Sequence, residues 1–386
     1  MLNVDDVYEY VNQRNVIDEN FTENISKLYK KNAKWIFPFY DLLCRVVFYW
    51  LRPKEKIKYF VLGNRFSHLI NTFPKKDICI IGGPRQLLYC LKNNLSYLPN
   101  GDFWTLLSTG FTQDVRSSLL KKSCCMQKVL TRLSDRNAQV MLIVENDSLP
   151  LQRTFCNIAA AANIKTVCIQ HGLFQSKTEA KIIDGWKCDY FICYDNNQKN
   201  IITGLGIAPN KVIVGGFYEP ITKVVDSKPK NEIKVCFLGQ PWFKYGELYK
   251  TKYINCIDIL TSQLKSANIS YSFKPHPWET DAPYLKSMAN IFDGNMNDAI
   301  IEHDVFLSFT STALLEVTMA GKLAIQIYDE QFACDNFEKI GYAYTINSQD
   351  LDKSILDIIH KSPFELEMPD FKNLSHQIKK LTMVNM

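Results

Sequence analysis

The sequence predicts an α/β protein made of two Rossmann-like domains that face a central cleft. Apolar runs alternate with helical segments in both halves of the chain, which is typical of parallel sheets with helical crossovers. The 386 residues exceed what one hydrophobic core usually serves. In each half, polar clusters also follow the apolar runs, at the edge where open parallel sheets bind ligands.

The first half divides into a helical segment and an α/β domain. Residues 1–74 are expected to be mostly helical, and residues 75–220 are expected to form the first Rossmann-like domain. A glycine turn at 82–83 and a helix over 85–93 follow its first strand. The strands of this domain are predicted at 77–82, 103–109, 140–144, 166–170, 189–194 and 211–214.

The second half, residues 221–386, restarts the same pattern after a polar linker at 218–232 that contains two prolines. We expect the C-terminal tail either to return toward the first half or to hang free. The predicted strands are 233–238, 269–274, 305–307 and 323–327, and the predicted helices are 247–267, 312–320 and 351–361.

Composition limits the classes of partner. The formal net charge of +5 is too small to indicate nucleic acid, and it suits anionic substrates or an anionic membrane surface. Twelve cysteines lie mostly singly inside apolar runs, without zinc-site spacing, so we expect reduced core residues of a cytoplasmic protein. The N-terminus has no secretory signal pattern.

Residues 33–51 form an apolar, aromatic stretch bracketed by basic residues. Asp41 and Arg45 inside it make a spanning helix the least favoured interpretation. Two interpretations remain equal: a helix in the interface of the inner membrane, together with the basic residues up to 58, or a helix packed on the first domain.

The first polar cluster follows two successive strands. Glu145 and Asp147 come after the run 140–144, and His171 comes after the run 166–169. Right-handed parallel pairing would bring these residues to the same edge. A carboxylate or a neutral imidazole there can act as a general base, while Asp147 could instead cap the following helix. All three are candidate catalytic residues.

The second cluster is Lys274-Pro275-His276-Pro277. The two prolines restrict the backbone on both sides of His276, so the direction of its ring is constrained. With Lys274 nearby, His276 suits a phosphate-bearing ligand, although a tight structural turn would show the same pattern. We also count His276 among the catalytic candidates.

A hydroxyl-rich element at 308–312 leads into the helix predicted at 312–320. Hydroxyls and N–H groups at the start of a helix favour the binding of an anion. The alternative is that these residues only cap the helix. Glu316, one turn further on, could accept hydrogen bonds from a ribose, and Gly239-Gln240 allows the backbone to approach a phosphate. The candidate donor-binding residues are Gly239, Gln240, Lys274, His276, Pro277, Ser308, Thr310, Ser311, Thr312 and Glu316.

Several familiar motifs are absent from the sequence. It contains no GxxxxGK[ST] loop, no GxGxxG after the first strand of either half and no HExxH. We also find no Asp-x-Asp element of the kind that holds a metal–nucleotide complex. We therefore expect no metal and no cofactor, with protein groups stabilising a leaving phosphate.

Four segments resemble known families. ICIIGGPRQLLYCL at 78–91, FKPHPWE at 273–279 and FTSTALLE at 309–316 resemble elements of bacterial sialyltransferases and polysialyltransferases within the GT-B superfamily. IQHGLF at 169–174 resembles the QHG segment of capsule Kdo transferases and teichoic-acid glycerophosphotransferases. In place of the acidic motif of the sialyltransferases, which ends in glycine, this chain has Glu145-Asn146-Asp147-Ser148.

The resemblance implies a glycosyltransferase of bacterial capsule, O-antigen or lipooligosaccharide synthesis. Its second domain would bind a nucleotide sugar, first of all CMP-sialic acid or another CMP-ulosonate, and its first domain a glycan or lipid-linked glycan acceptor. One alternative is a CDP-glycerol or CDP-ribitol phosphotransferase. The other is a scaffold that binds nucleotide sugars without catalysis.

Overall fold

The structure is a computed structural model of the 386-residue chain. It describes residues 2–17, 22–24, 26–27, 30, 51–146, 149–176, 186–224, 232–244, 246–277, 279, 282, 284–285, 290–332, 334–366, 368–369 and 371–383. Most of the aromatic stretch 33–51 and the candidate Asp147 therefore lie outside the described residues. Within the described part, no helix is both long and apolar enough to span a membrane.

The chain divides into two compact units, which we describe separately. Unit 1 contains residues up to His171, residues 181 to Pro220 and residues from Pro369 onward. Unit 2 contains residues Gly172 to 180 and Ile221 to Met368. The chain thus passes from unit 1 to unit 2 directly after His171.

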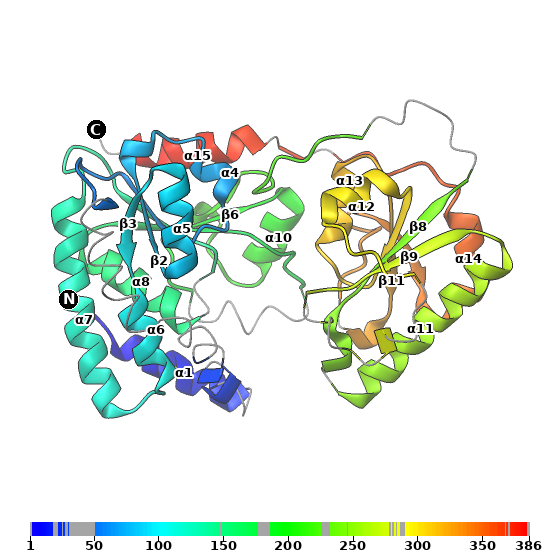
Figure 1. Ribbon diagram of the computed structural model, residues 1–386, viewed down its shortest axis with the longest axis horizontal. Coiled ribbons are helices and arrows are strands. Elements are labelled where there is room, and N and C mark those ends of the chain that lie inside the picture. The colour runs from blue at the N-terminus through cyan, green and yellow to red at the C-terminus, as the bar shows by residue number, and fades with distance from the viewer. Residues whose placement is uncertain are drawn as a thin grey trace. The chain divides into compact units, whose positions relative to one another are not determined.

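Unit 1 is built on a parallel sheet in the order β3-β2-β1-β4-β5-β6-β7. Its strands are almost entirely buried because helices cover the sheet (Figure 1), which explains their continuous apolar sequences. The strands are β1 (Tyr59–Leu62), β2 (Ile78–Gly82), β3 (Ser96–Pro99), β4 (Met141–Val144), β5 (Lys165–Ile169), β6 (Tyr190–Cys193) and β7 (Val212–Val214). The helices are α1 (Asp5–Ile17), α4 (Ser67–Ile70), α5 (Pro84–Asn93), α6 (Gly101–Ser108), α7 (Gln113–Leu133), α8 (Pro150–Ala161), α10 (Asn196–Gly204) and α15 (Phe371–Met383).

Unit 2 has a smaller parallel sheet in the order β12-β11-β10-β8-β9. One apolar core joins α11 and α14 to this sheet, with Phe237, Ile257, Leu260 and Ile355 among its buried residues. The strands are β8 (Lys234–Leu238), β9 (Ser270–Lys274), β10 (Val305–Ser308), β11 (Leu323–Tyr328) and β12 (Tyr344–Asn347). The helices are α11 (Glu247–Ser266), α12 (Met296–Glu302), α13 (Ala313–Met319) and α14 (Leu351–Ile358).

Three helices end in the same way before a strand. Asn94, Asn163 and Asn268 follow α5, α8 and α11 with φ angles of 53°, 57° and 53°. Asparagine tolerates this left-handed conformation better than most residues. The next residue in each case is apolar, and its N–H bonds back to the helix, as Ile164 does to the Ala159 carbonyl at 2.8 Å. These turns send the chain back into the sheet as β3, β5 and β9.

The structure differs from the sequence prediction in the early part of unit 1. Tyr59–Leu62 was expected to be helical, yet it forms β1, which pairs with both β2 and β4 in the middle of the sheet. Four apolar residues are too short a run to reveal their period. Residues 103–109 lie largely in α6 rather than in a strand, and the strand at this place in the sheet is β3.

The C-terminal helix α15 returns to unit 1, one of the two outcomes expected from the sequence. Leu374 and Ile378 on this helix are fully buried. The Thr72 hydroxyl lies 2.9 Å from the Ser375 hydroxyl, and the Asn373 amide donates to the Val214 carbonyl at 3.3 Å. The tail therefore covers the sheet of unit 1 (Figure 1).

The described cysteines are all free, and most of them are buried, which confirms the prediction that they are core residues. Burial raises the pKa of the Cys193 and Cys236 thiols to about 12. These thiols are therefore protonated at neutral pH and are poor nucleophiles.

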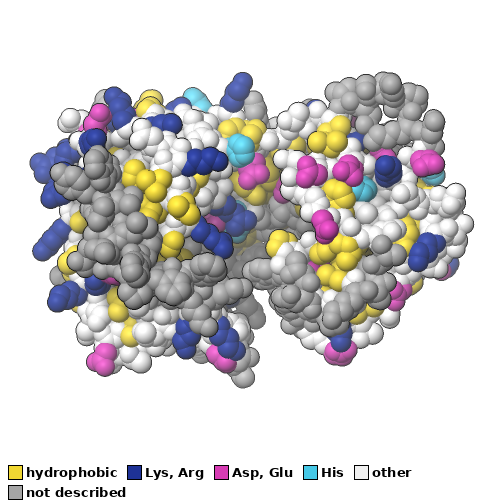
Figure 2. Space-filling model, viewed as in Figure 1, with side chains coloured by type: hydrophobic (Ala, Val, Ile, Leu, Met, Phe, Trp, Pro, Cys, Tyr) yellow, Lys and Arg dark blue, Asp and Glu magenta, His cyan; other side chains and the backbone are white. Residues whose placement is uncertain are grey.

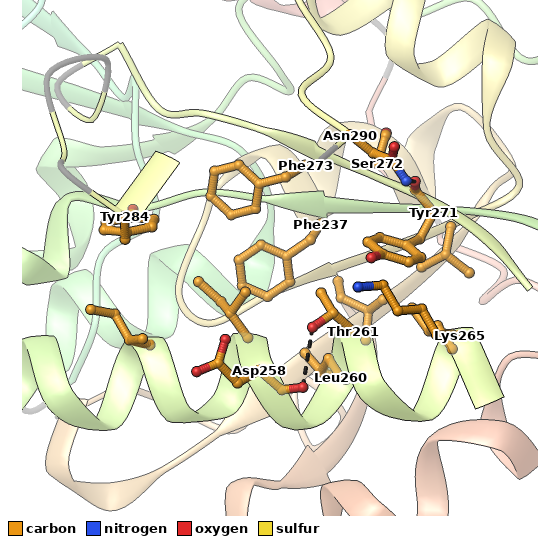
Figure 3. Close-up of a pocket in the computed structure, with 15 residues that line it drawn as sticks. Phe237, Asp258, Leu260, Thr261, Lys265, Tyr271, Ser272, Phe273, Tyr284 and Asn290 are labelled. Carbon is orange, nitrogen blue, oxygen red and sulfur yellow. Dashed lines mark hydrogen bonds between the residues drawn. The ribbon is translucent and has the colours of Figure 1, made fainter. Parts of the chain in front are cut away.

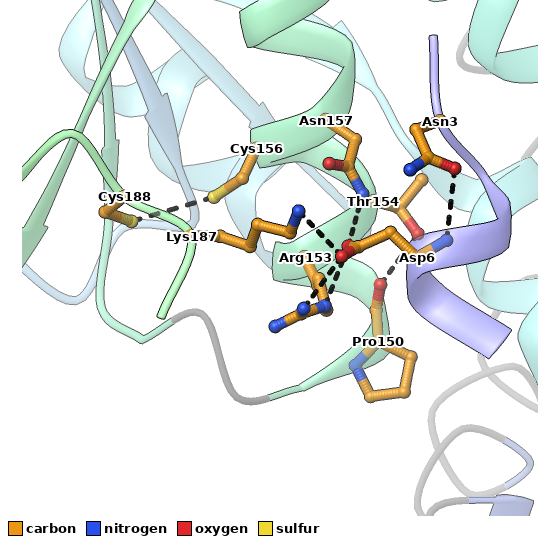
Figure 4. A network of polar contacts seen from close by, with 9 residues as sticks. All are labelled: Asn3, Asp6, Pro150, Arg153, Thr154, Cys156, Asn157, Lys187 and Cys188. Carbon is orange, nitrogen blue, oxygen red and sulfur yellow. Dashed lines mark hydrogen bonds and ion pairs between the residues drawn. The ribbon is translucent and has the colours of Figure 1, made fainter. Parts of the chain in front are cut away.

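A buried charged network holds α1 on unit 1 (Figure 4). The Asp6 carboxylate accepts two hydrogen bonds from the Arg153 guanidinium, at 2.8 and 2.9 Å, and pairs with the Lys187 ammonium at 2.6 Å. Burial raises the pKa of Asp6, but its bonds to Arg153, Asn157 and Lys187 outweigh burial, so the net pKa is lowered. Asp6 thus links α1 to α8 and to the segment before β6.

We expect Asp6→Asn to lower the free energy of unfolding by about 3 kcal/mol at neutral pH, because it leaves the buried Arg153 guanidinium and the partly exposed Lys187 ammonium without their anion. The pKa of Asp6 is depressed in the folded protein, so its stabilising contribution is fully present above the unfolded pKa of about 3.9. This contribution is lost as the pH falls through the pKa that Asp6 has in the folded protein. Urea unfolding across this pH range measures both effects.

The neighbouring Asp5 provides the control. Its carboxylate pairs with Arg116 but is 54% exposed, so Asp5→Asn should cost less than about 1 kcal/mol. Equal losses in the two variants would contradict a structural role for the buried network.

Candidate functional site

The strand ends of unit 2 carry the predicted donor-binding residues. In a parallel sheet all strands end at the same edge. Gly239 follows β8, Pro275 follows β9 and Phe309 follows β10, and these three strands are neighbours in the order β10-β8-β9. The structure therefore brings the three predicted segments, 239–240, 274–277 and 308–312, to one edge of one sheet.

A buried carboxylate that the sequence prediction overlooked joins two of these segments. Glu279 is fully buried, and its carboxylate accepts the His276 N–H at 2.8 Å and the Tyr253 hydroxyl at 2.6 Å. The Tyr284 hydroxyl donates to it as well. Burial raises the pKa of Glu279 above its usual range, while these donors oppose the rise. Glu279 is the last residue of the FKPHPWE segment, which is the sequence signal that could have found it.

The same network continues to β8 and β10. The Tyr253 hydroxyl accepts the Gln240 N–H at 2.9 Å. The Gln240 side chain then accepts the Thr310 N–H at 2.7 Å and donates to the Thr310 hydroxyl at 2.9 Å. A continuous chain of hydrogen bonds thus runs from Glu279 through Tyr253 and Gln240 to Thr310.

Several predicted ligand groups are engaged within unit 2. The Ser308 hydroxyl is fully buried and donates to the Leu238 carbonyl at 2.8 Å. The Gly239 N–H donates to the Lys274 carbonyl at 2.9 Å. The Lys274 ammonium donates to the Gly294 carbonyl and lies 5.7 Å from the centre of the Phe292 ring. In this structure these groups hydrogen-bond to backbone carbonyls and so stabilise the loops after the strands.

Other predicted groups lie at the surface of the same edge. Ser311 and Thr312 directly precede α13, are partly exposed, and have no hydrogen-bond partner for their N–H groups in the described part of the chain. The Thr312 hydroxyl accepts the Leu173 N–H at 3.0 Å. His276 is half-buried, Pro277 is exposed, and Glu316 lies half-buried in the first turn of α13.

The strand ends of unit 1 bring Glu145 and His171 together. Glu145 follows β4 and His171 lies two residues beyond β5, its pairing partner. Nδ1 of His171 lies 2.7 Å from the Glu145 carbonyl oxygen, and the Glu145 carboxylate lies 3.3 Å from the Arg65 guanidinium. Arg65 follows β1, the strand that the sequence prediction missed, so its place in this cluster was missed as well.

The surroundings of His171 favour a neutral imidazole. Burial lowers its pKa, the Arg65 charge lowers it further, and Glu145 opposes both. Because a carbonyl oxygen can only accept, Nδ1 must carry the proton. The neutral ring then presents an unprotonated Nε2, which is the form a general base requires. Asp147 lies outside the described residues, so its placement beside this cluster stays a prediction.

Among the described residues, no group of three His, Cys, Asp or Glu side chains could hold a metal ion. The triplet Asp350-Leu351-Asp352 is an Asp-x-Asp sequence, but it lies at the start of α14, where Leu351 is buried in the core and Asp352 is exposed.

A cavity of about 270 Å³ lies elsewhere in unit 2, between α11 and the sheet (Figure 3). Its walls include Phe237, Phe273 and Leu260, and Asp258 and Lys265 lie among its lining residues. None of the predicted donor-binding residues lines it. We therefore place the candidate site at the strand ends and not in this cavity.

No family model matches the sequence, and no curated protein sequence matches it. Solved structures do share its fold. The UDP-GlcNAc 2-epimerase of Methanocaldococcus jannaschii aligns over 84% of this chain and 98% of its own, with 14% identity and a TM-score of 0.55. The same protein in complex with UDP-GlcNAc and UDP gives 12% identity over 84% and 98% of the two chains, with a TM-score of 0.53.

Anabaena HepE in complex with UDP and glucose aligns over 86% of this chain and 100% of its own, with 11% identity and a TM-score of 0.52. At these identities the likeness concerns the fold. Together with the two parallel sheets, it confirms the predicted α/β fold of the GT-B type with two Rossmann-like domains.

Gly239 tests the network at the strand ends. A Cβ atom on this residue would lie 2.0 Å from Glu279 Oε2 and 2.9 Å from Phe273 Cζ. We expect Gly239→Ala to destabilise the protein by about 1–3 kcal/mol, because both neighbours are buried and cannot easily move. Chemical denaturation measures the loss.

Gly204 near the end of α10 is the matched control, because nothing lies within 4 Å of its added Cβ. Gly204→Ala should be neutral or slightly stabilising. If the Gly239→Ala variant is as stable as this control, Gly239 does not pack closely against Glu279.

Proposed function

We propose that this protein is a metal-independent glycosyltransferase that moves a sugar from a nucleotide sugar onto a bacterial surface glycan. The observation that carries the proposal is the hydrogen-bonded chain from Glu279 to Thr310, which fixes three loops at one sheet edge. On that edge lie an imidazole, two partly exposed hydroxyl residues and their adjacent N–H groups. Such preorganised donors stabilise the charge that develops on a leaving phosphate.

The roles follow the chemistry of each group. The His276 ring and the N–H groups of Ser311 and Thr312 would bind the donor phosphates, with Lys274 adding a positive charge. Glu316 would accept from the ribose. In unit 1, His171 Nε2 would take the proton from the acceptor hydroxyl, with Glu145 and Asp147 as the carboxylate alternatives.

The FKPHPWE and FTSTALLE segments favour a CMP-ulosonate such as CMP-sialic acid. The solved structures with the same fold contain UDP-GlcNAc, or UDP and glucose, which supports a nucleotide sugar without favouring CMP. The acceptor would be a capsule, O-antigen or lipooligosaccharide glycan, and we propose that the protein reaches it from the cytoplasmic face of the inner membrane.

The proposal is tested by offering the purified protein CMP-sialic acid, CMP-Kdo, UDP-GlcNAc, UDP-glucose and CDP-glycerol, each with and without a glycan acceptor. We expect acceptor-dependent release of nucleotide that persists in EDTA. Turnover of UDP-GlcNAc without acceptor would indicate an epimerase, and turnover of CDP-glycerol a phosphotransferase. Nucleotide binding without turnover would indicate a scaffold, and loss of transfer in EDTA would contradict the metal-independent mechanism.

We expect His276→Ala to reduce kcat by about 10²–10³, the usual cost of removing one group that stabilises developing charge. The fold should remain intact because the substitution keeps the backbone N–H that bonds Glu279. His360→Ala, at an exposed position just after α14, is the control and should keep full activity. A folded His276→Ala enzyme with normal kcat/KM would exclude the proposed role.

The pH dependence of kcat/KM tests whether His171 is the base in unit 1. Because the pKa of His171 is lowered, the acid limb of kcat/KM should lie below about pH 6.5, the ordinary histidine value. Arg65→Gln removes a charge that lowers this pKa, so the acid limb should move to higher pH. Arg85→Gln, an exposed change in the first turn of α5, should leave the limb in place.

The substitutions Glu145→Gln, Asp147→Asn and His171→Ala identify the base directly. The true base should lose kcat while donor binding is kept. If all three variants turn over normally, unit 1 does not supply the base. If His171→Ala loses donor affinity instead, this residue belongs to phosphate binding.

A further inference from the structure

The strands of unit 1 start at an edge that is rich in basic side chains. β1 and β2 are parallel neighbours, so the residues that lead into them lie side by side. Arg52 and Lys54 precede β1, while Lys75 and Lys76 precede β2, about twenty residues further along the sequence. A hollow of about 340 Å³ at this edge is lined by all four, and Glu55 is the one carboxylate among its lining residues.

Lys56 and Lys58 extend the same edge. We call the six residues Arg52, Lys54, Lys56, Lys58, Lys75 and Lys76 the basic edge. Two carboxylates accompany them: Glu55 lies 4.0 Å from the Lys76 ammonium, and Asp77 lies 3.6 Å from the Lys58 ammonium. Lys54, Lys56, Lys75 and Lys76 are exposed. The edge therefore carries a clear excess of positive charge that water and a partner can reach.

We propose that the basic edge docks unit 1 on an anionic lipid bilayer. Charge complementarity favours this partner, since basic residues near an anionic membrane surface each strengthen binding about fivefold. A hollow rimmed by four cations also suits phosphate headgroups. In the sequence, the aromatic stretch 33–51 immediately precedes Arg52. The structure adds Lys75 and Lys76, whose place beside Arg52 and Lys54 the sequence does not reveal.

Docking at this edge has a consequence for the acceptor. Glu145 and His171 lie beyond the ends of β4 and β5, so they occupy the opposite edge of the same sheet. Strands of four to five residues separate the two edges by about 15 Å, at about 3.3 Å per residue. The bilayer would then lie at least this far from the proposed base. The acceptor that this arrangement suits is an extended glycan, several sugars away from its lipid. This step rests on the proposed function.

Vesicle flotation tests the docking without any assay of activity. The probes are vesicles of phosphatidylethanolamine with phosphatidylglycerol, and vesicles of phosphatidylcholine alone. We expect the full chain to float only with the anionic vesicles and to be released by salt. Lys75→Glu combined with Lys76→Glu should reduce the partition coefficient at least about twenty-five-fold, since two contributions of about fivefold each are lost.

Lys265→Glu combined with Lys353→Glu is the matched control, because it changes the net charge equally at exposed positions of unit 2. The control should float like the wild type. An equal loss of flotation in both double variants would show that only the total charge matters, and the proposal that the basic edge docks on the bilayer would be wrong. Failure of the wild type to float would also overturn the proposal, as would unchanged flotation of the Lys75/Lys76 variant.

A series of lipid-linked acceptors tests the second step. Enzyme bound to anionic vesicles should use an acceptor with a long glycan and fail on one whose accepting sugar is next to the lipid. The same short glycan without its lipid should remain a substrate in solution. Equal use of short and long lipid-linked acceptors would refute the orientation, while inactivity on every acceptor would refute the proposed function and leave the flotation result intact.

Discussion

The candidate donor site depends on one buried carboxylate. Glu279 has no exposed surface, and its hydrogen bonds reach the His276 N–H and the hydroxyls of Tyr253 and Tyr284. A buried acid is unfavourable unless such donors surround it, so once the loops fold around Glu279 they cannot separate without leaving several groups unsatisfied. Gly239 is required for the same reason, because any side chain there would occupy the place of the carboxylate.

This constraint separates the residues that hold the site from those that can reach a ligand. Ser308, Gln240 and the Gly239 N–H all bond within unit 2, so replacing them would disturb the loops before it disturbed any ligand. His276 differs from these groups, because Glu279 fixes its backbone N–H and the residue is only half-buried. A fixed backbone beside a half-buried imidazole suits preorganised stabilisation of charge.

The sequence predicted the order of elements best where apolar runs end in glycine or in polar residues. β2, β4, β5, β8, β9 and β10 and the polar segments after them all lie where expected. What escaped prediction depends on contacts between distant residues. β1 is only four residues long, and its central place in the sheet is set by pairing with β2 and β4. Arg65 follows β1, so its contact with Glu145 could not be predicted either. Glu279 was in a recognised segment, but its burial depends on tyrosines from other elements.

Unit 1 holds the His171 ring without a carboxylate partner on Nδ1. A carboxylate on Nδ1 of His171 would raise the pKa of the ring and favour the imidazolium form. The Glu145 carbonyl oxygen holds Nδ1 instead, and the Glu145 carboxylate is turned to Arg65. The carbonyl fixes the tautomer without adding a full negative charge, and Arg65 offsets the charge of the nearby carboxylate. These contacts favour a neutral ring with an unprotonated Nε2, which is the form that the proposed general base requires.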